Sequence, residues 1–325
     1  MGSIASLPAS ASATASAAPA RPSNAATGRA THRLALAALA ATFLLLAAGG
    51  IVTSRDAGMV FPDWPLSNGS LNPEGWLHDA DKMSEHGHRI LGTLVGLLSI
   101  WLAVRLQRRE RRRWVRVLGW CALGAVVLQG LLGGLRVLEI SGTLALVHGC
   151  TGQLFFCLMV LLAYLTSSDA GSVPEPGPDA RRLSVLGLAA LSAVLLQVAL
   201  GAQLRHNLGP IDAHVLGALL SAGTVFWVLA GVALRHGARR PLCRPALLLA
   251  ALLLLQVGLG ILAARALSDP RALGAQALAL VLPSLHQAVG GLLLGCITWL
   301  TAKAIRRSGR FAAGVAPRPP AGGVR

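Results

Sequence analysis

Long apolar runs dominate the sequence and constrain the fold more than any other feature. Eight stretches approach the length of about 20 residues that a helix needs to cross the hydrocarbon core of a bilayer. A helix is favoured there because it satisfies its own backbone hydrogen bonds in lipid. The stretches are residues 34–54, 88–104, 115–135, 143–166, 183–204, 212–234, 245–266 and 281–302. We therefore expect an all-α integral membrane protein with eight transmembrane helices.

The charged residues indicate how these helices are oriented. The chain is 54% apolar and 13% charged, with a net charge of +16, but only 4% of its residues are aromatic. Most of the 29 lysines and arginines lie in the N-terminal tail, in 105–116, 181–182 and 235–244, and from Lys303 onward. Because positive loops stay cytoplasmic, we expect both termini to be cytoplasmic and loop 55–87 to face outside. The basic charge is thus explained by a lipid bilayer, and no nucleic acid partner is expected.

A helix pair recurs four times along the chain. Odd helices carry Gln-x-x-x-Gly, with Ala-Gly-Gly in the first as a degenerate copy, and an arginine follows within five residues. Even helices carry a histidine near their outer end and a glycine one turn later. The odd-helix residues are Gly49, Gln129 and Gly133, Gln197 and Gly201, Gln256 and Gly260, with Arg55, Arg136, Arg205 and Arg265. The even-helix residues are His88 and Gly92, His148 and Gly152, His214 and Gly217, His286 and Gly290.

This repeat divides the chain into two pseudo-symmetric halves. We expect a disordered N-terminal tail at 1–33, a four-helix bundle at 34–166, a cytoplasmic linker at 167–182, a second four-helix bundle at 183–302, and a basic cytoplasmic tail at 303–325. The five cysteines form no C-x-x-C pair. Neither a zinc site nor a disulfide framework is therefore expected.

The four recurring histidines suit axial ligation of heme iron. A polar side chain inside a membrane span is costly, so its recurrence at one depth in four helices calls for a function. Neutral imidazole is a common iron ligand, and a glycine on the same helix face leaves room for a flat macrocycle. A single histidine is as well explained by a hydrogen bond between helices or by a proton relay in a transporter. The metal ligands are predicted to be His88, His148, His214 and His286.

Two further kinds of charged residue fit such a site. The four outer arginines, Arg55, Arg136, Arg205 and Arg265, lie where heme propionates would emerge, and guanidinium groups match carboxylates well. Each is equally explained as an interfacial anchor that reaches toward water.

Glu85 precedes His88 by three residues, so both lie on one helix face. It is the candidate catalytic carboxylate at the heme rim, although a helix N-terminal charge is the plain alternative.

These residues together resemble the heme A synthase family of inner-membrane proteins. The specific part is Gly58-Met59-x-x-Pro62-Asp63-Trp64-Pro65-Leu66-x-Asn68-Gly69, followed by Glu85-x-x-His88-Arg89 and Gln129-Gly-x-x-Gly-Gly134. The similarity continues through His148, His214 and His286-Gln287, and covers nearly everything from 34 to 302.

The resemblance implies oxidation of the C8 methyl of heme O to a formyl group, which makes heme A for terminal oxidases. It implies that His88 and His148, with Arg55 and Arg136, hold the substrate heme. It likewise implies that His214 and His286, with Arg205 and Arg265, hold a heme b cofactor, and that Glu85 is the essential carboxylate. The implied partners are a heme O synthase and an electron donor, and a homo-oligomer is left open. The heme sites are expected near the outer face of the inner (plasma) membrane.

One departure from the family pattern concerns the outer loop. Many members have two cysteines flanking Pro-Asp-Trp-Pro, where this chain has Phe61 and Ser67. A loop disulfide and any electron transfer through those thiols are therefore excluded here.

Two rival functions share some of these features. A bis-heme electron-transfer cytochrome needs the four histidines but no outer carboxylate, and a histidine-dependent proton transporter predicts a colourless protein. The outer loop and Glu85 favour the synthase.

Overall fold

The protein is described here by a computed structural model that covers residues 25–171, 179–236, 240–268 and 275–308. Within these ranges every regular element is a helix, and eight helices are long and apolar enough to cross a membrane. This confirms the expected all-α membrane protein. The helices are α1 (Ala25–Ser54), α2 (Ala80–Arg109), α3 (Arg113–Leu138), α4 (Gly142–Thr166), the short α5 (Ser168–Gly171), α6 (Ala180–Arg205), α7 (Ile211–His236), α8 (Arg240–Ser268) and α9 (Ala275–Arg307).

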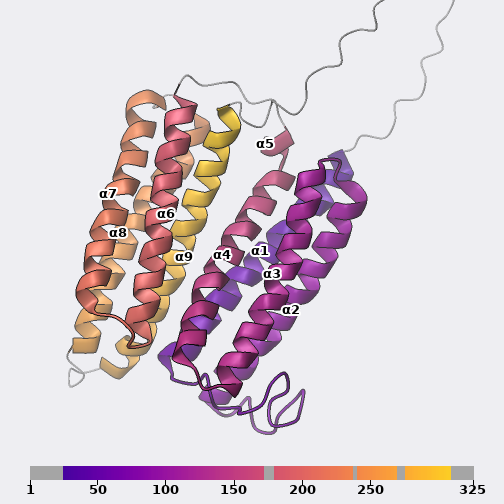
Figure 1. Ribbon diagram of the computed structural model, residues 1–325, viewed down its shortest axis with the longest axis vertical. Coiled ribbons are helices and arrows are strands. Elements are labelled where there is room, and N and C mark those ends of the chain that lie inside the picture. The colour runs from indigo at the N-terminus through magenta and orange to yellow at the C-terminus, as the bar shows by residue number, and fades with distance from the viewer. Residues whose placement is uncertain (1–24, 172–178, 237–239, 269–274, 309–325) are drawn as a thin grey trace, which may run out of the picture.

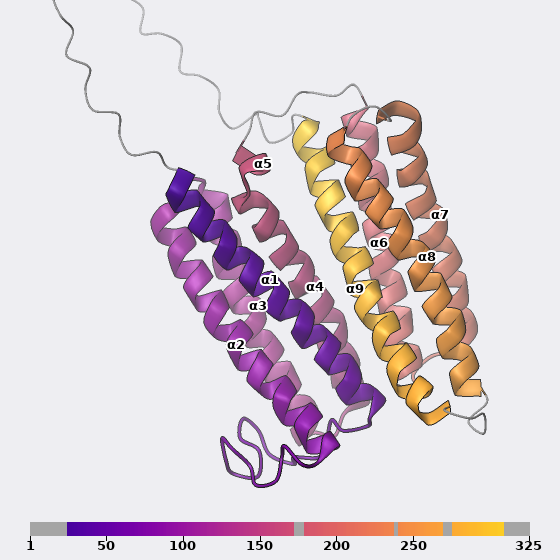
Figure 2. The ribbon, with the colours of Figure 1, turned by 180° about the vertical axis from the view of Figure 1, so that it is seen from behind.

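The long helices form two bundles that lie side by side. Helices α1–α4 make one bundle and α6–α9 make the other, and α9 packs against α1 and α4 (Figures 1 and 2). Helix α1 begins, and α9 ends, at the same end of the molecule as α5 (Figure 1). Residues 55–79 lie at the opposite end. We call these two ends the α5 end and the loop end.

Helix α1 begins earlier than the apolar pattern predicts. The expected disordered tail 1–33 is wrong from Ala25 onward, because the helix already includes 25–33; residues 1–24 lie outside the described ranges. The hydroxyl of Thr31 is buried and accepts a hydrogen bond of 3.0 Å from Nε of Arg105 on α2. Packing against α2 therefore extends α1 toward the N-terminus beyond the charged residue Arg33, at which the apolar stretch that predicted this span begins.

Helix α2 also begins earlier, so the outer loop is 55–79 and not 55–87. The Asp79 side chain caps this helix by accepting hydrogen bonds from the backbone amides of Asp81 at 2.9 Å and Lys82 at 3.0 Å. Such a cap satisfies amides that the first helical turn leaves free. The two amides donate to Asp79 and hold the pKa of its carboxyl below the ordinary value. Consequently His88 lies more than two turns inside the helix.

The expected linker and basic tail are partly helical. Helix α5 lies inside the predicted linker 167–182, and α6 begins at Ala180; residues 172–178 lie outside the described ranges. Helix α9 continues to Arg307, inside the predicted tail 303–325. Nζ of Lys303 forms an ion pair of 2.7 Å with Asp169 of α5, and this contact holds the C-terminal part of α9 to α5.

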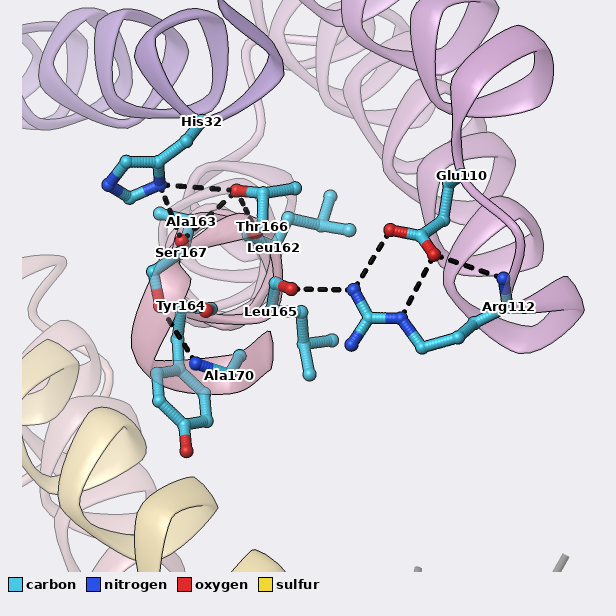
Figure 3. A network of polar contacts seen from close by, with 10 residues as sticks. All are labelled: His32, Glu110, Arg112, Leu162, Ala163, Tyr164, Leu165, Thr166, Ser167 and Ala170. Carbon is cyan, nitrogen blue, oxygen red and sulfur yellow. Dashed lines mark hydrogen bonds and ion pairs between the residues drawn. The ribbon is translucent and has the colours of Figure 1, made fainter. Parts of the chain in front are cut away.

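Polar contacts close the first bundle at the α5 end (Figure 3). Arg112, in the α2–α3 turn, donates to the carbonyl of Leu165 at 2.7 Å and pairs with Glu110 at 2.8 Å. Burial alone would raise the pKa of the Glu110 carboxyl, but the bonds from Arg112 outweigh it and hold the pKa below its ordinary value. Nδ1 of His32 lies 3.1 Å from the carbonyl of Ala163. These contacts fasten α1 and the α2–α3 turn to the end of α4.

The two bundles are joined by polar side chains near the loop end. Oγ of Ser54 lies 2.8 Å from Oγ of Ser284 on α9, and Arg205 of α6 donates to the same Ser54 hydroxyl. The amide of Gln287 donates to the carbonyl of Leu46 at 3.3 Å. In lipid, where apolar burial does not drive helix association, such bonds and close packing hold helices together.

Candidate functional site

Two of the predicted ligands face each other in the second bundle. The ring centroids of His214, on α7, and His286, on α9, are 6.2 Å apart, and the ring planes make an angle of 72°. Two imidazoles that bond to one metal ion at about 2.0 Å each have centroids roughly 6 Å apart. The structure therefore brings this pair together at the separation that a shared axial metal requires.

Glutamines of the preceding helices hold these two imidazoles. The amide nitrogen of Gln197 donates to the backbone carbonyl of His214 at 2.9 Å and lies 3.1 Å from its Nδ1. Nδ1 of His286 donates to the backbone carbonyl of Gln256 at 3.1 Å. The Nε2 atom of His286 then carries the lone pair, and the Gln256 amide nitrogen lies 3.2 Å from it. In His286 the carbonyl acceptor on Nδ1 thus fixes the tautomer that leaves Nε2 able to bind metal, whereas the Gln197 amide is a donor and holds His214 mainly through its backbone carbonyl.

The odd-helix glycines of the repeat make room for the imidazole rings. A Cβ added at Gly201 would lie 3.0 Å from Cε1 of His214, and one added at Gly260 would lie 2.9 Å from Cε1 of His286. Both distances are shorter than ordinary van der Waals contact. These glycines therefore let each histidine ring lie against the backbone of the neighbouring helix.

The even-helix glycines have a different role from the one that the sequence suggested. Gly217 and Gly290 face the side chains of Gln197 and Gln256, and only open space lies next to Gly92. At Gly217 and Gly290 a glutamine side chain thus occupies the space that was expected to admit a macrocycle, whereas the space next to Gly92 is open among the described residues. Gln197 and Gln256 need that space, because each amide must pass the even helix to reach the histidine.

The glycine and glutamine contacts recur in the first bundle with one change. Cβ atoms at Gly49 and Gly133 would lie 3.1 Å and 3.2 Å from Cε1 of His88 and His148. With its amide oriented to satisfy both neighbours, Gln129 donates to the backbone carbonyl of His148 at 3.1 Å and accepts from Thr151 at 2.6 Å. The first helix has leucine at the matching position. Nδ1 of His88 is buried and, within the described residues, has no hydrogen-bond partner.

His88 also lines a cavity at the loop end. The cavity has a volume of about 440 Å³ and lies between α1, α2 and the outer loop. Almost all of its lining is apolar. The lining residues are Ala48, Ile51, Trp76, Met83, Ser84, Gly87, His88, Ile90 and Leu91. One of the four predicted ligands is thus reachable from an apolar space beside the bundle.

Glu85 is buried, and both of its carboxylate oxygens are occupied. Oε2 accepts a hydrogen bond of 3.0 Å from the backbone amide of Phe61, and Oε1 pairs with Arg89 one turn further along α2. Arg89 also donates to three carbonyls of the outer loop. Arg89 directly follows His88 in the sequence, and no role was predicted for it. Its position four residues after Glu85 was the available signal, since such pairs meet on one helix face.

The side chain of His86, a residue of α2, packs against the outer loop. Nδ1 of His86 lies 3.0 Å from Oγ of Ser67, and the His86 ring packs edge-on against Trp76 with centroids 4.8 Å apart. Phe61 and Ser67 are both almost fully buried around it. The two residues that replace the family's cysteines therefore form a small packed core within the loop.

The four outer arginines lie in four different environments. Arg55 pairs with Asp81 at 2.7 Å, and Arg205 donates to Ser54. Arg136 points into the loop, where it donates to the carbonyl of Gly58 at 3.4 Å, and its buried Nε has no partner among the described residues. Arg265 is exposed at the end of α8. Of the four, Arg136 has the buried and unsatisfied donor that an incoming carboxylate would suit.

The donor set fits heme better than a bare metal ion. Within the described ranges, no group of three or more His, Cys, Asp or Glu side chains is placed to hold a metal ion. Heme brings four nitrogen ligands of its own and needs only two axial ligands from the protein. The paired imidazoles in the second bundle, and the glycine beside each of the four histidines, satisfy that requirement.

Three other histidines, His78, His206 and His236, lie outside the fourfold repeat. His78 is exposed in the outer loop. His206 caps the end of α6, where burial, followed by the nearby charges of Arg136 and Arg205, lowers its pKa. His236 ends α7, and its side chain lies outside the described part of the chain.

Comparison with known proteins gives consistent similarities. The model of the family described as cytochrome oxidase assembly protein matches residues 2–133 and 78–209. A heme A synthase of Symbiobacterium thermophilum is 33% identical over 189 residues, which are 55% of this chain and 60% of that protein. A heme A synthase of Rhodopseudomonas palustris is 31% identical over 163 residues, which are 46% of this chain and 45% of that protein. A heme A synthase of Lysinibacillus sphaericus is 30% identical over 134 residues, which are 40% of this chain and 43% of that protein. The chain thus spans about half the length of these relatives.

Proposed function

Because the chain belongs to the cytochrome oxidase assembly protein family, we propose that it is a heme A synthase, an oxidoreductase that converts the C8 methyl of heme O to a formyl group. The observation that carries the proposal is the exposure of His88 to an apolar cavity beside the outer loop. A substrate heme has to enter and leave, so one of its predicted ligands must be reachable. The apolar lining suits a hydrophobic substrate that arrives from the bilayer.

The two bundles take different parts in this proposal. His88 and His148 in 34–166 bind the substrate heme, and His214 and His286 in 183–302 bind heme b as the resident cofactor. Heme b supplies one-electron redox chemistry when bound. The chain's own residues orient the ligands: glutamine amides and carbonyls fix the second pair, and glycines let all four rings lie against neighbouring helices.

The arginines and the membrane placement complete the proposal. Arg136 and Arg55 bind the propionates of the substrate heme. Arg205 and Arg265 bind the propionates of heme b. The two bundles are related by pseudo-symmetry through the helix-pair repeat. Most lysines and arginines flank the α5 end, which supports cytoplasmic termini and heme sites toward the outer face of the inner (plasma) membrane. A heme O synthase and an electron donor are the expected partners.

Pigment extraction tests the activity directly. The chain is expressed in a host that makes heme O but not heme A, and extracted hemes are separated and identified. Heme A should appear with the wild-type chain and disappear with His88→Ala, while the absorption of the second-bundle heme persists. A coloured protein that makes no heme A would contradict the synthase and support the electron-transfer cytochrome. A colourless protein would contradict both and support a transporter.

A further inference from the structure

Arg89 connects helix α2 to one short segment of the outer loop. Its guanidinium donates to the carbonyls of Asp63 at 2.7 Å, of Phe61 at 3.2 Å and of Leu66. It also lies over the Phe61 ring, with its central carbon 5.6 Å from the centroid. One cation therefore binds three carbonyls within six consecutive residues. Such bonds fix the course of the segment 61–66, which has no strand or helix of its own.

Glu85 completes the attachment from the same helix face. It holds Arg89 through Oε1 and the Phe61 amide through Oε2. The side chains of this pair are 14% and 5% exposed, so solvent screens the attraction only weakly. Each carboxylate oxygen of Glu85 therefore accepts one hydrogen bond from the loop or from the residue that holds it. The contacts give Glu85 a role in anchoring the loop.

The segment held in this way reaches over the first bundle. The indole of Trp64 lies where a Cβ at Gly134 would be, on the face of α3. The neighbouring residue, Gly133, is the glycine that contacts the ring of His148. Arg136, one turn onward, donates to the carbonyl of Gly58 in the same loop. The loop is thus fixed to α2, which carries His88, and to α3, which contacts His148.

We infer that Arg89 is a positioning residue that holds segment 61–66, with Trp64, as a lid over the substrate heme site of the first bundle. Glu85 acts through Arg89 and the Phe61 amide. This inference rests on the proposed function for the identity of the ligand, a heme whose ligands are His88 and His148. The attachment of the loop itself can be tested without any heme.

Thiol labelling tests the attachment. Ser67 is 1% exposed, and the five native cysteines all lie within the long helices. Ser67→Cys therefore places a reporter in the docked loop for a membrane-impermeant maleimide. Arg89→Met should speed labelling by about tenfold or more, because the loss of several charge-assisted hydrogen bonds frees the segment. The matched control is Lys82→Ala, which removes a positive charge from the same helix and should leave the rate unchanged.

Heme O titration tests the consequence for the site. Arg89→Met should weaken heme O binding by about tenfold, and Arg89→Lys should recover part of it. The absorption of the heme held by His214 and His286 should stay at the wild-type level in both variants. Glu85→Gln keeps an acceptor for the Phe61 amide and should retain clearly more heme A formation than Glu85→Ala.

The outcomes separate this inference from the proposed function. Unchanged labelling in Arg89→Met would overturn the attachment, and faster labelling with unchanged heme O affinity would overturn the positioning role. Equal inactivity of Glu85→Gln and Glu85→Ala, with the loop still protected, would identify Glu85 as a proton-transfer group and overturn its assignment here. If labelling responds as expected but the wild-type chain binds no heme O, the attachment stands and the proposed function fails.

Discussion

Replacing Gly260 by alanine tests whether the glycine repeat exists to seat the imidazoles. The added Cβ would lie 2.9 Å from Cε1 of His286, whereas ordinary carbon contacts are 3.4 Å or longer. The ring cannot simply turn away, because its Nδ1 is bonded to the Gln256 carbonyl at 3.1 Å. Overpacking of this kind costs about 1–3 kcal/mol. If the ring yields at the expense of its bond to iron, heme affinity should fall by roughly 5- to 150-fold.

The assay is heme retention by the purified protein during transfer to apomyoglobin, followed in the Soret band. Gly258→Ala is the matched control, because it lies on the same helix and nothing is within 4 Å of the added Cβ. It should keep wild-type retention. Equal retention by Gly260→Ala and Gly258→Ala would refute the role assigned to the glycine.

Three further predictions concern other contacts. Gln256→Leu removes an amide N–H that competes with iron for the Nε2 lone pair of His286 and keeps the backbone carbonyl on Nδ1, so heme retention should stay at least at the wild-type level in the same transfer assay; weaker retention would contradict this. The backbone amides of Gly69 and Asn68 donate to Asp63 and lower the pKa of its carboxyl in the folded protein. The Asp63 carboxylate should therefore stabilise the loop fully above a pH of about 4, the pKa of an unperturbed aspartate. This stabilisation should be lost as the pH falls through the lower pKa of the folded state. Maleimide labelling of a loop cysteine at different pH checks this, and Asp63→Asn should remove the pH dependence. Ser54→Ala should lower the free energy of unfolding by about 1–2 kcal/mol in detergent, because it removes the hydroxyl that accepts from Arg205 and that contacts Ser284 across the bundles; no change in thermal unfolding would contradict this.

The boundaries of the helices show where sequence patterns stop being sufficient. An apolar window ends at the first charged residues, so it placed the start of the second span at 88, whereas the Asp79 cap starts the helix at Ala80. It likewise missed the helical residues from Ala25, where packing against Arg105 supports polar residues. Caps and contacts between helices extend helices beyond the membrane-spanning lengths that hydrophobicity predicts.

The repeat predicted candidate ligands, which stay a prediction, but it did not predict the contacts that hold them. The repeat identified His214 and His286, and the structure places their ring centroids 6.2 Å apart. It also displayed the glutamines, but not that each amide reaches the histidine of the following helix. At Gly217 and Gly290 a glutamine of the preceding helix occupies the space that was predicted for a macrocycle, since the spacing along one helix does not tell which helix lies next to it.

The sequence alone determined eight spanning helices and a fourfold repeat of histidines, because apolar length and residue recurrence are properties of a single chain segment. Only the tertiary structure decided which glycine meets which ring, that the His86 side chain packs against the loop, and that Arg89 and Glu85 bind segment 61–66. These depend on how one helix or loop is rotated and shifted against another. Close packing and hydrogen bonding across the bundles determine this rotation and shift, and a pattern within one segment does not predict them.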